Sequence, residues 1–134
     1  GYRVDGIGWQ GHLMNNQWLK QFVENLDLEL KKLSDLIDWA HSNNLEFHIT
    51  ELDYYNDGEN NIFNSVEKQA EVYQKLMNLS QEKSKNGLVT VNFWSMGERK
   101  SNRGKIGHYM SIYDNDTIPT KTYEVVKKFI NFNQ

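Results

Sequence analysis

Three short apolar runs alternate with longer stretches in which apolar residues recur every three to four positions, and this alternation limits the fold more than any other feature. The apolar runs cover residues 4–9, 47–52 and 88–94, and the longer stretches cover 27–42, 65–86 and 120–130. Short apolar runs predict β-strands, and a 3.6-residue repeat predicts amphipathic helices. Because a helix separates each strand from the next, we expect parallel strands joined by right-handed crossovers. The pattern is typical of α/β proteins, and it fits both a doubly wound sheet and a (β/α)8 barrel.

Residues at the ends of the longer stretches predict where the helices begin and stop. Asp27 is expected to be the N-cap of the first helix, and Asn64 or Ser65 that of the second. Gly87 is expected to end the second helix. The third helix is expected to turn three residues inward, namely Tyr123, Val126 and Ile130.

Length, charge and cysteine content exclude several functional classes. The 134 residues suffice for one domain with a real core, and nothing within 1–134 marks an internal boundary. The net charge of −3 argues against a nucleic-acid partner, and no apolar stretch approaches the roughly 20 residues of a membrane span. Without cysteine there is no thiolate metal site, and the histidines are not spaced as ligands, so no metal or cofactor is expected.

Two carboxylates mark the end of the second apolar run. Glu51 and Asp53 lie two positions apart, so they are expected to share one strand face and to disturb each other's ionisation. The same alternation places Ile49 on their face and His48 on the opposite face, where we expect it to be a structural residue packed under the helices.

Other polar and aromatic residues end the neighbouring strands. Gln10 and His12 follow the first strand, and Trp94 ends the third. The C-terminal edge of parallel strands is where both α/β architectures place their sites, so these side chains are expected to converge with the two carboxylates at one mouth. Aromatic residues make up 13% of the chain, which favours sugar stacking over nucleobase stacking given the charge, although most of them fill the core.

The motifs VDGIGWQGHL, ITELD and VNFWSMGERKSNR, in this order and followed by KTYEVV, resemble the C-terminal part of family 10 glycoside hydrolases, the endo-β-1,4-xylanases. The resemblance runs from Val4 to Ile130. It implies an α/β fold that is the C-terminal portion of a (β/α)8 TIM barrel, about three β/α units holding strands six to eight, incomplete as it stands. The first helix, residues in the second and the start of the third also fall where the family has them.

The resemblance also implies a role for each candidate site residue. Glu51 matches the nucleophile of a retaining mechanism, in which a glycosyl-enzyme intermediate forms and water hydrolyses it. His12 and Asp53 match the hydrogen-bonding partners of that carboxylate. Gln10 matches an amide that contacts the sugar, and Trp94 matches an aromatic floor beneath it. The implied substrate is xylan or a xylo-oligosaccharide, and the implied location is extracellular or periplasmic.

Several residues also allow simpler interpretations. Trp94 could be an ordinary core residue, and the acidic pair could be an acidic strand end without function. His41 and His108 are assigned no role. Trp18 lies in a stretch that reads as a short packing helix, and the alternative is that it borders the substrate groove.

The chain departs from the family pattern at three positions of one loop. Asn102 stands where the family has a second tryptophan over the sugar, Glu98 where an aspartate is typical, and Ser95 where a glycine follows the strand-end tryptophan. These departures weaken the expectation of tight binding at the cleavage site and of a strict preference for plain xylan.

The general acid of the family is also missing. It is a glutamate that follows an asparagine at the end of strand four, and no Asn-Glu dipeptide occurs in the chain. A barrel typically needs about 250 residues, so three β/α units require the N-terminal barrel half as a partner. We therefore expect the chain to supply the nucleophile half of a xylanase and to be inactive by itself.

Two other functions are compatible with the sequence. One is a non-catalytic carbohydrate-binding remnant of the same barrel that keeps Gln10 and Trp94. The other is a different α/β enzyme with the same order of elements. Intact Glu51, His12 and Asp53 argue against the remnant, because sugar binding alone has no need of that triple.

Overall fold

The computed structural model of the chain describes residues 1–13, 17–55, 63, 65–94, 113 and 118–131. These residues form four strands and four helices. In chain order the elements are β1 (Gly6–Trp9), β2 (His12–Leu13), α1 (Gln17–Glu24), α2 (Leu26–Ser42), β3 (Glu46–Tyr54), α3 (Val66–Lys83), β4 (Val89–Phe93) and α4 (Lys121–Asn131). The predicted alternation of strands and helices is confirmed, and α1 is the short packing helix expected around Trp18.

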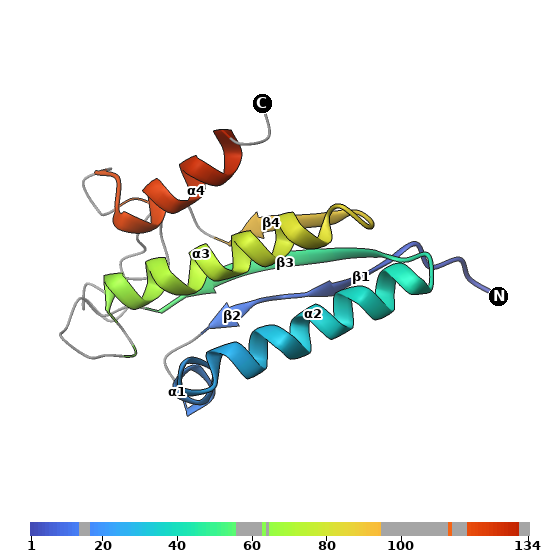
Figure 1. Cartoon of the computed structure of the whole chain (residues 1–134), viewed down its shortest axis with the longest axis horizontal. Helices are drawn as coiled ribbons and strands as arrows, with labels where there is room; N and C mark the ends of the chain where they lie inside the picture. The colour runs from blue at the N-terminus through green and yellow to red at the C-terminus, as the bar shows by residue number, and fades with distance from the viewer. Residues whose placement is uncertain (14–16, 56–62, 64, 95–112, 114–117, 132–134) are drawn as a thin grey trace.

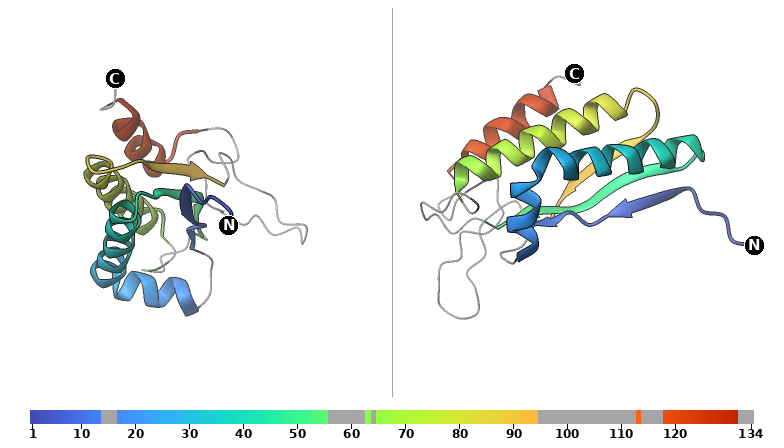
Figure 2. Two further views of the ribbon diagram at one scale, coloured as in Figure 1. Left: turned by 90° about the vertical axis from the view of Figure 1, so that its right-hand side faces the viewer. Right: turned by 60° about the horizontal axis from the view of Figure 1, so that its bottom comes forward.

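The strands form one parallel sheet whose spatial order follows the chain. β3 lies in the centre, β1 and its continuation β2 pair with one edge, and β4 pairs with the other. The helices α2 and α3 lie on the same face of the sheet, and α4 packs against α3 (Figures 1 and 2). A doubly wound sheet carries helices on both faces and reverses its strand order, so this arrangement is a section of a β/α barrel that the described residues do not close.

The helix-covered face of the sheet carries the core. On β3 the side chains of Phe47, Ile49, Leu52 and Tyr54 are fully buried. On the neighbouring strands Trp9 stacks on Phe22 of α1, and Phe93 stacks on Tyr73 of α3. No described helix is long and apolar enough to cross a membrane.

The observed helix ends confirm one predicted cap and correct two others. Ser65 is the N-cap of α3, and its side chain accepts a hydrogen bond from the backbone N–H of Lys68. Asp27 is not a cap, because α2 begins one residue earlier, after Asn25, and Asp27 lies in its first turn. Gly87 does not end α3, which finishes at Lys83 and is followed by Ser84 in a right-handed conformation.

The buried face of α4 differs from the predicted one at its end. Val126 is buried as expected and Tyr123 is half-buried, but Ile130 is 53% exposed. Thr122 is fully buried instead, because its hydroxyl donates to the side-chain oxygen of Gln69, 2.9 Å away on α3. The buried face of this helix thus includes a hydrogen-bonded polar residue, which a hydrophobic pattern does not reveal.

Candidate active site

One extra residue in β3 decides which way the two carboxylates face. Ile49 pairs with Val91 of β4, and Leu52 pairs with Phe93, so Thr50 and Glu51 together lie opposite the single residue between those partners. The pairing of β3 with its other neighbours shows the same insertion. Each residue of β1 pairs with the β3 residue 40 positions later in the sequence, whereas each residue of β2 pairs with the one 41 positions later, so β3 contains one extra residue between the two. This is a β-bulge, a feature that re-aims side chains and occurs often beside active sites.

Because of the bulge, the residues on each face of β3 differ from the predicted ones. Before it, Ile49 points to the helices while His48 lies on the open face of the sheet, where its Nδ1 is 2.8 Å from the hydroxyl of Thr90. After it, Leu52 points to the helices and Glu51 lies on the open face. Glu51 therefore does not share a face with Ile49, and His48 is not packed under the helices. A regular alternation would have placed both carboxylates in the core.

A histidine joins the two carboxylates. Nε2 of His12 is 3.0 Å from Oε2 of Glu51, and its Nδ1 is 2.8 Å from Oδ2 of Asp53. The His12 and Glu51 side chains are 28% and 26% exposed, whereas Asp53 is 1% exposed. A protonated ring donates one hydrogen bond to each carboxylate, so Asp53 fixes the ring from behind and the ring fixes Glu51 at the accessible surface.

Burial and the neighbouring charges shift the pKa values of His12 and Asp53 in opposite directions. Burial lowers the pKa of His12, but the hydrogen bonds and negative charges of Asp53 and Glu51 outweigh it and raise the pKa above its ordinary value. Burial raises the pKa of Asp53, and the ring of His12 only partly offsets this effect. The ring is thus held toward its protonated form, in which it donates to Glu51.

The remaining candidate residues flank this triple. The indole of Trp94 is 51% exposed and meets the ring of His12 edge to face, with centroids 5.6 Å apart and planes at 90°. Gln10 has an exposed side chain, and its backbone carbonyl accepts a hydrogen bond from the N–H of Glu51 at 2.9 Å. The structure thus brings all five predicted residues to the C-terminal edge of the sheet, and Trp94 is not a core residue.

A glycine that the sequence motifs do not single out shapes the turn between Gln10 and His12. Gly11 has a φ of +79°, a conformation that side chains disfavour, and a Cβ there would lie 3.2 Å from Ile49 and 3.4 Å from Leu52. Its carbonyl accepts a hydrogen bond from the N–H of Asp53. The lone glycine between two polar site residues was the available indication of this role.

Other predicted positions lie elsewhere. Trp18 lines an apolar groove between α1 and α2 together with Trp9, on the helix side of the sheet rather than at the mouth. Ser95, Glu98, Asn102 and His108 lie outside the described residues, and so does Asn64. In the described parts of the chain, no group of three or more His, Asp or Glu side chains is placed to hold a metal ion.

The sheet section carries a carboxylate, a histidine and a second carboxylate at its C-terminal edge, which is the edge where β/α barrels place their active sites. The carboxylate at the accessible end can act as a nucleophile, since it is held by a donor and is open to a ligand.

Comparisons with known proteins identify the family. The model of glycosyl hydrolase family 10 matches residues 1–129. Among solved structures, xylanase 10B from Thermotoga maritima is 24% identical with a TM-score of 0.58, over 97% of this chain and 37% of that one. Xylanase XynB from Paenibacillus barcinonensis is 19% identical with a TM-score of 0.63, over 92% and 38%. Xylanase 10B from Thermotoga petrophila, solved in complex with xylobiose, is 23% identical with a TM-score of 0.56, over 96% and 37%.

The chain belongs to glycosyl hydrolase family 10. It spans a little more than a third of the length of these solved relatives, whose barrel it matches in part. No curated protein matches the sequence.

Proposed function

We propose that this chain supplies the nucleophile side of a retaining site that hydrolyses β-1,4-xylosidic bonds in xylan. Glu51 attacks the anomeric carbon, a bond from its carboxylate oxygen to that carbon forms, and the bond to the leaving sugar breaks. Water then hydrolyses the resulting ester and restores the carboxylate. The observation that supports this most is the position of His12, which contacts both Glu51 and the buried Asp53.

The neighbouring residues serve this step in different ways. His12 holds the carboxylate of Glu51 in one orientation, and Asp53 fixes the ring that does so. Trp94 offers an exposed aromatic surface beside that ring on which a xylose ring can stack. Gln10 lies next to Glu51 and offers an amide to a sugar hydroxyl.

The proton for the leaving group comes from elsewhere in the barrel. In retaining glycosidases the acid lies about 5–5.5 Å from the nucleophile, and this sequence has no Asn-Glu pair to supply it. We propose that the acid is carried by the N-terminal barrel units, and that the chain by itself does not hydrolyse xylan. We further propose that the assembled protein acts on xylan or xylo-oligosaccharides outside the cell or in the periplasm.

The test combines the chain with the first five strand-and-helix units of a family 10 barrel and measures the cleavage of xylohexaose. We expect no cleavage by the chain alone, cleavage by the mixture, and no cleavage when the mixture contains Glu51→Gln. Gln74→Glu, on the exposed side of α3, is a control that should leave cleavage unchanged. Cleavage by the chain alone, or by the mixture containing Glu51→Gln, would contradict the proposal.

A second candidate function is sugar binding without catalysis, and the half-exposed indole of Trp94 favours it. The two functions differ in their dependence on Glu51. Binding of xylohexaose that survives Glu51→Ala but is lost in Trp94→Ala, together with no cleavage by the mixture, would favour the binding function.

A further inference from the structure

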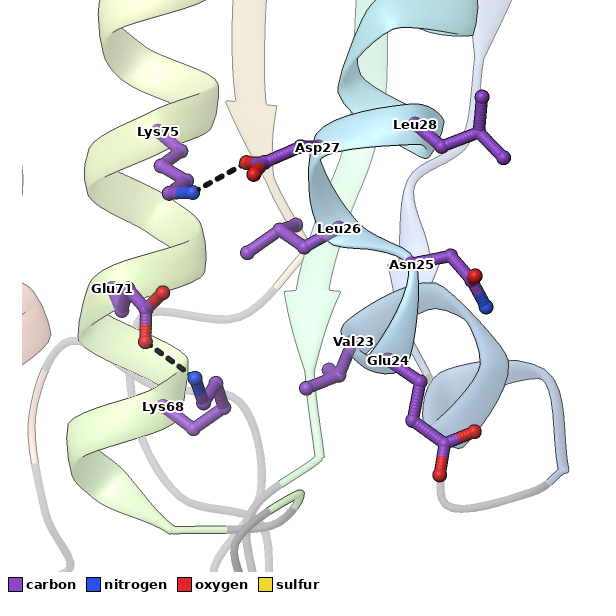
Figure 3. Close-up of a pocket in the computed structure, with 9 residues that line it drawn as sticks. All are labelled: Val23, Glu24, Asn25, Leu26, Asp27, Leu28, Lys68, Glu71 and Lys75. Carbon is purple, nitrogen blue, oxygen red and sulfur yellow. Dashed lines mark hydrogen bonds and ion pairs between the residues drawn. The ribbon is translucent and has the colours of Figure 1, made fainter.

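The charged side chains where α3 meets α2 are paired with one another. Lys75 of α3 bonds Asp27 of α2 at 2.7 Å, and Lys68 bonds Glu71 within α3. Figure 3 shows both pairs around a hollow of about 280 Å³ between the two helices. Both lysines that line this hollow are thus occupied by carboxylates, and the polar groups on this side of α3 are satisfied.

The inner side of α3 carries a polar atom that is not satisfied in this way. The hydroxyl of Tyr73 is fully buried, and among the described residues it has no hydrogen-bond partner. The same holds for Oδ1 of Asp53, because His12 contacts only Oδ2 of that carboxylate. Buried polar groups in folded proteins are nearly always hydrogen-bonded, and an unpaired one calls for a bound water or ion as its explanation.

The packing of α3 on β3 places these two groups in the same region. Gln69 of α3 donates to the backbone carbonyl of Tyr54 at 3.0 Å, and Tyr73 lies one helical turn later on the same face of the helix. Because α3 runs back along β3 (Figure 1), this turn brings Tyr73 over the residues just before Tyr54. Its ring also stacks on Phe93, with centroids 5.9 Å apart, and Phe93 is the β4 partner of the residue that precedes Asp53.

The two groups also interact electrostatically. Burial raises the pKa of the Tyr73 hydroxyl, and the negative charge of Asp53 raises it further. Burial likewise raises the pKa of Asp53. The ring of His12 and the backbone N–H of Leu13 lower it again, and the charge of Glu51 raises it. Tyr73 therefore stays protonated at neutral pH and is a hydrogen-bond donor near a carboxylate that burial pushes toward its neutral form.

We propose that one bound water joins the hydroxyl of Tyr73 to Oδ1 of Asp53, which makes Tyr73 a further positioning residue of the site. The hydroxyl donates to the water and the water donates to the carboxylate, so both buried atoms obtain partners. Donation to a carboxylate favours its ionised form, so Tyr73 keeps Asp53 charged against the effect of burial. The charged carboxylate in turn holds the ring of His12 against Glu51. This inference deepens the proposed function, on which its link to catalysis rests.

The experiment follows the titration of Asp53 in the 134-residue chain by NMR of its side-chain carboxyl carbon. Tyr73→Phe removes the hydroxyl and keeps the ring, so we expect the pKa of Asp53 to rise by about one unit. Tyr54→Phe is the matched control. The Tyr54 side chain is equally buried but its hydroxyl bonds the backbone carbonyl of Phe63, so its loss should weaken the fold without moving the pKa of Asp53. Amide spectra check that both variants fold.

A second measurement needs no substitution. Rotating-frame NMR contacts between water and the ring protons of Tyr73 should reveal a long-lived bound water beside the hydroxyl. An unchanged pKa of Asp53 in Tyr73→Phe would overturn the inference, and so would an equal shift in Tyr54→Phe or the absence of these water contacts. Neither measurement needs activity. If Glu51 fails as a nucleophile while both expected results are obtained, the link between Tyr73 and Asp53 stands and only the proposed function is contradicted.

Discussion

Nδ1 of His12 lies 2.8 Å from Oδ2 of Asp53, a carboxylate that is 1% exposed. This contact places the negative charge of Asp53 behind a ring whose other nitrogen faces Glu51. A buried carboxylate that acts only through an intervening ring influences the site by electrostatics and orientation. It is therefore a positioning residue, and its effect is measurable on the ring itself.

The first prediction concerns the ionisation of His12. Its pKa should exceed 6.5 in the folded chain, because the bonds and charges of Asp53 and Glu51 outweigh the effect of burial. In Asp53→Asn the pKa should fall, because a neutral amide replaces the closer charge. Titration of the imidazole signals by NMR in both proteins measures this. An unchanged pKa in Asp53→Asn would show that the contact does not govern the ring.

The same shift predicts how stability depends on pH. Because the pKa of His12 is raised above the unfolded value of about 6.5, its charged form stabilises the fold fully below that pH. This stabilisation is lost as pH rises through the folded pKa. The free energy of unfolding, measured with urea from pH 5 upward, should therefore fall across this window. In His12→Asn the fall should be smaller, and an equal fall would assign the pH dependence to other groups.

A third prediction concerns Gly87, which packs against a ring rather than ending a helix. A Cβ at this position would lie 2.5–2.8 Å from ring atoms of His41. Gly87→Ala should therefore destabilise the chain by about 1–3 kcal/mol, as overpacking does. Urea unfolding measures the loss, and Asn86→Ala, at the exposed neighbouring position, is the control. The cost should largely vanish in a His41→Ala background, since that change removes the ring.

A fourth prediction concerns the hydrogen bonds that link the end of β3 to two helices. Gln69, fully buried on α3, donates to the carbonyl of Tyr54 at 3.0 Å and accepts from Thr122 of α4 at 2.9 Å. Thr122→Val removes one donor inside the core, and such losses cost about 1–3 kcal/mol. The exposed hydroxyl of Ser84 is the control, and Ser84→Ala should change the free energy of unfolding by no more than about 0.5 kcal/mol. Equal effects of the two variants would contradict the role of this link.

The sequence allowed the elements to be predicted, and also the meeting of five polar and aromatic side chains at the C-terminal edge of the sheet. It did not reveal the backbone geometry that brings them together. Strands and helices produce regular patterns of apolar residues along the sequence, so these elements were predictable. The Ser65 cap was predictable from its residue type at the start of such a pattern. The bulge at Thr50 and Glu51 breaks that regularity, and nothing in the local composition announces it.

The other differences between prediction and structure also arise from contacts between residues that are distant in the sequence. Glycine can end a helix or permit a close approach, and only the position of the His41 ring shows which applies to Gly87. Thr122 is buried in a hydrogen bond to Gln69, which is distant in sequence, whereas the apolar Ile130 is exposed. Such contacts depend on tertiary structure, which residue patterns along one segment do not encode.

The central claim is that Glu51 is a nucleophile, and covalent trapping tests it most directly. A 2,4-dinitrophenyl 2-deoxy-2-fluoro-β-xylobioside has a leaving group that needs no proton, so it does not require the missing acid. Intact-mass spectrometry of the chain with the N-terminal barrel units should show one added fluoroxylobiosyl group, and peptide mapping should place it on Glu51. Glu51→Gln should remain unlabelled. A label on another residue, or an unlabelled wild-type chain in a complex that binds xylobiose, would contradict the account.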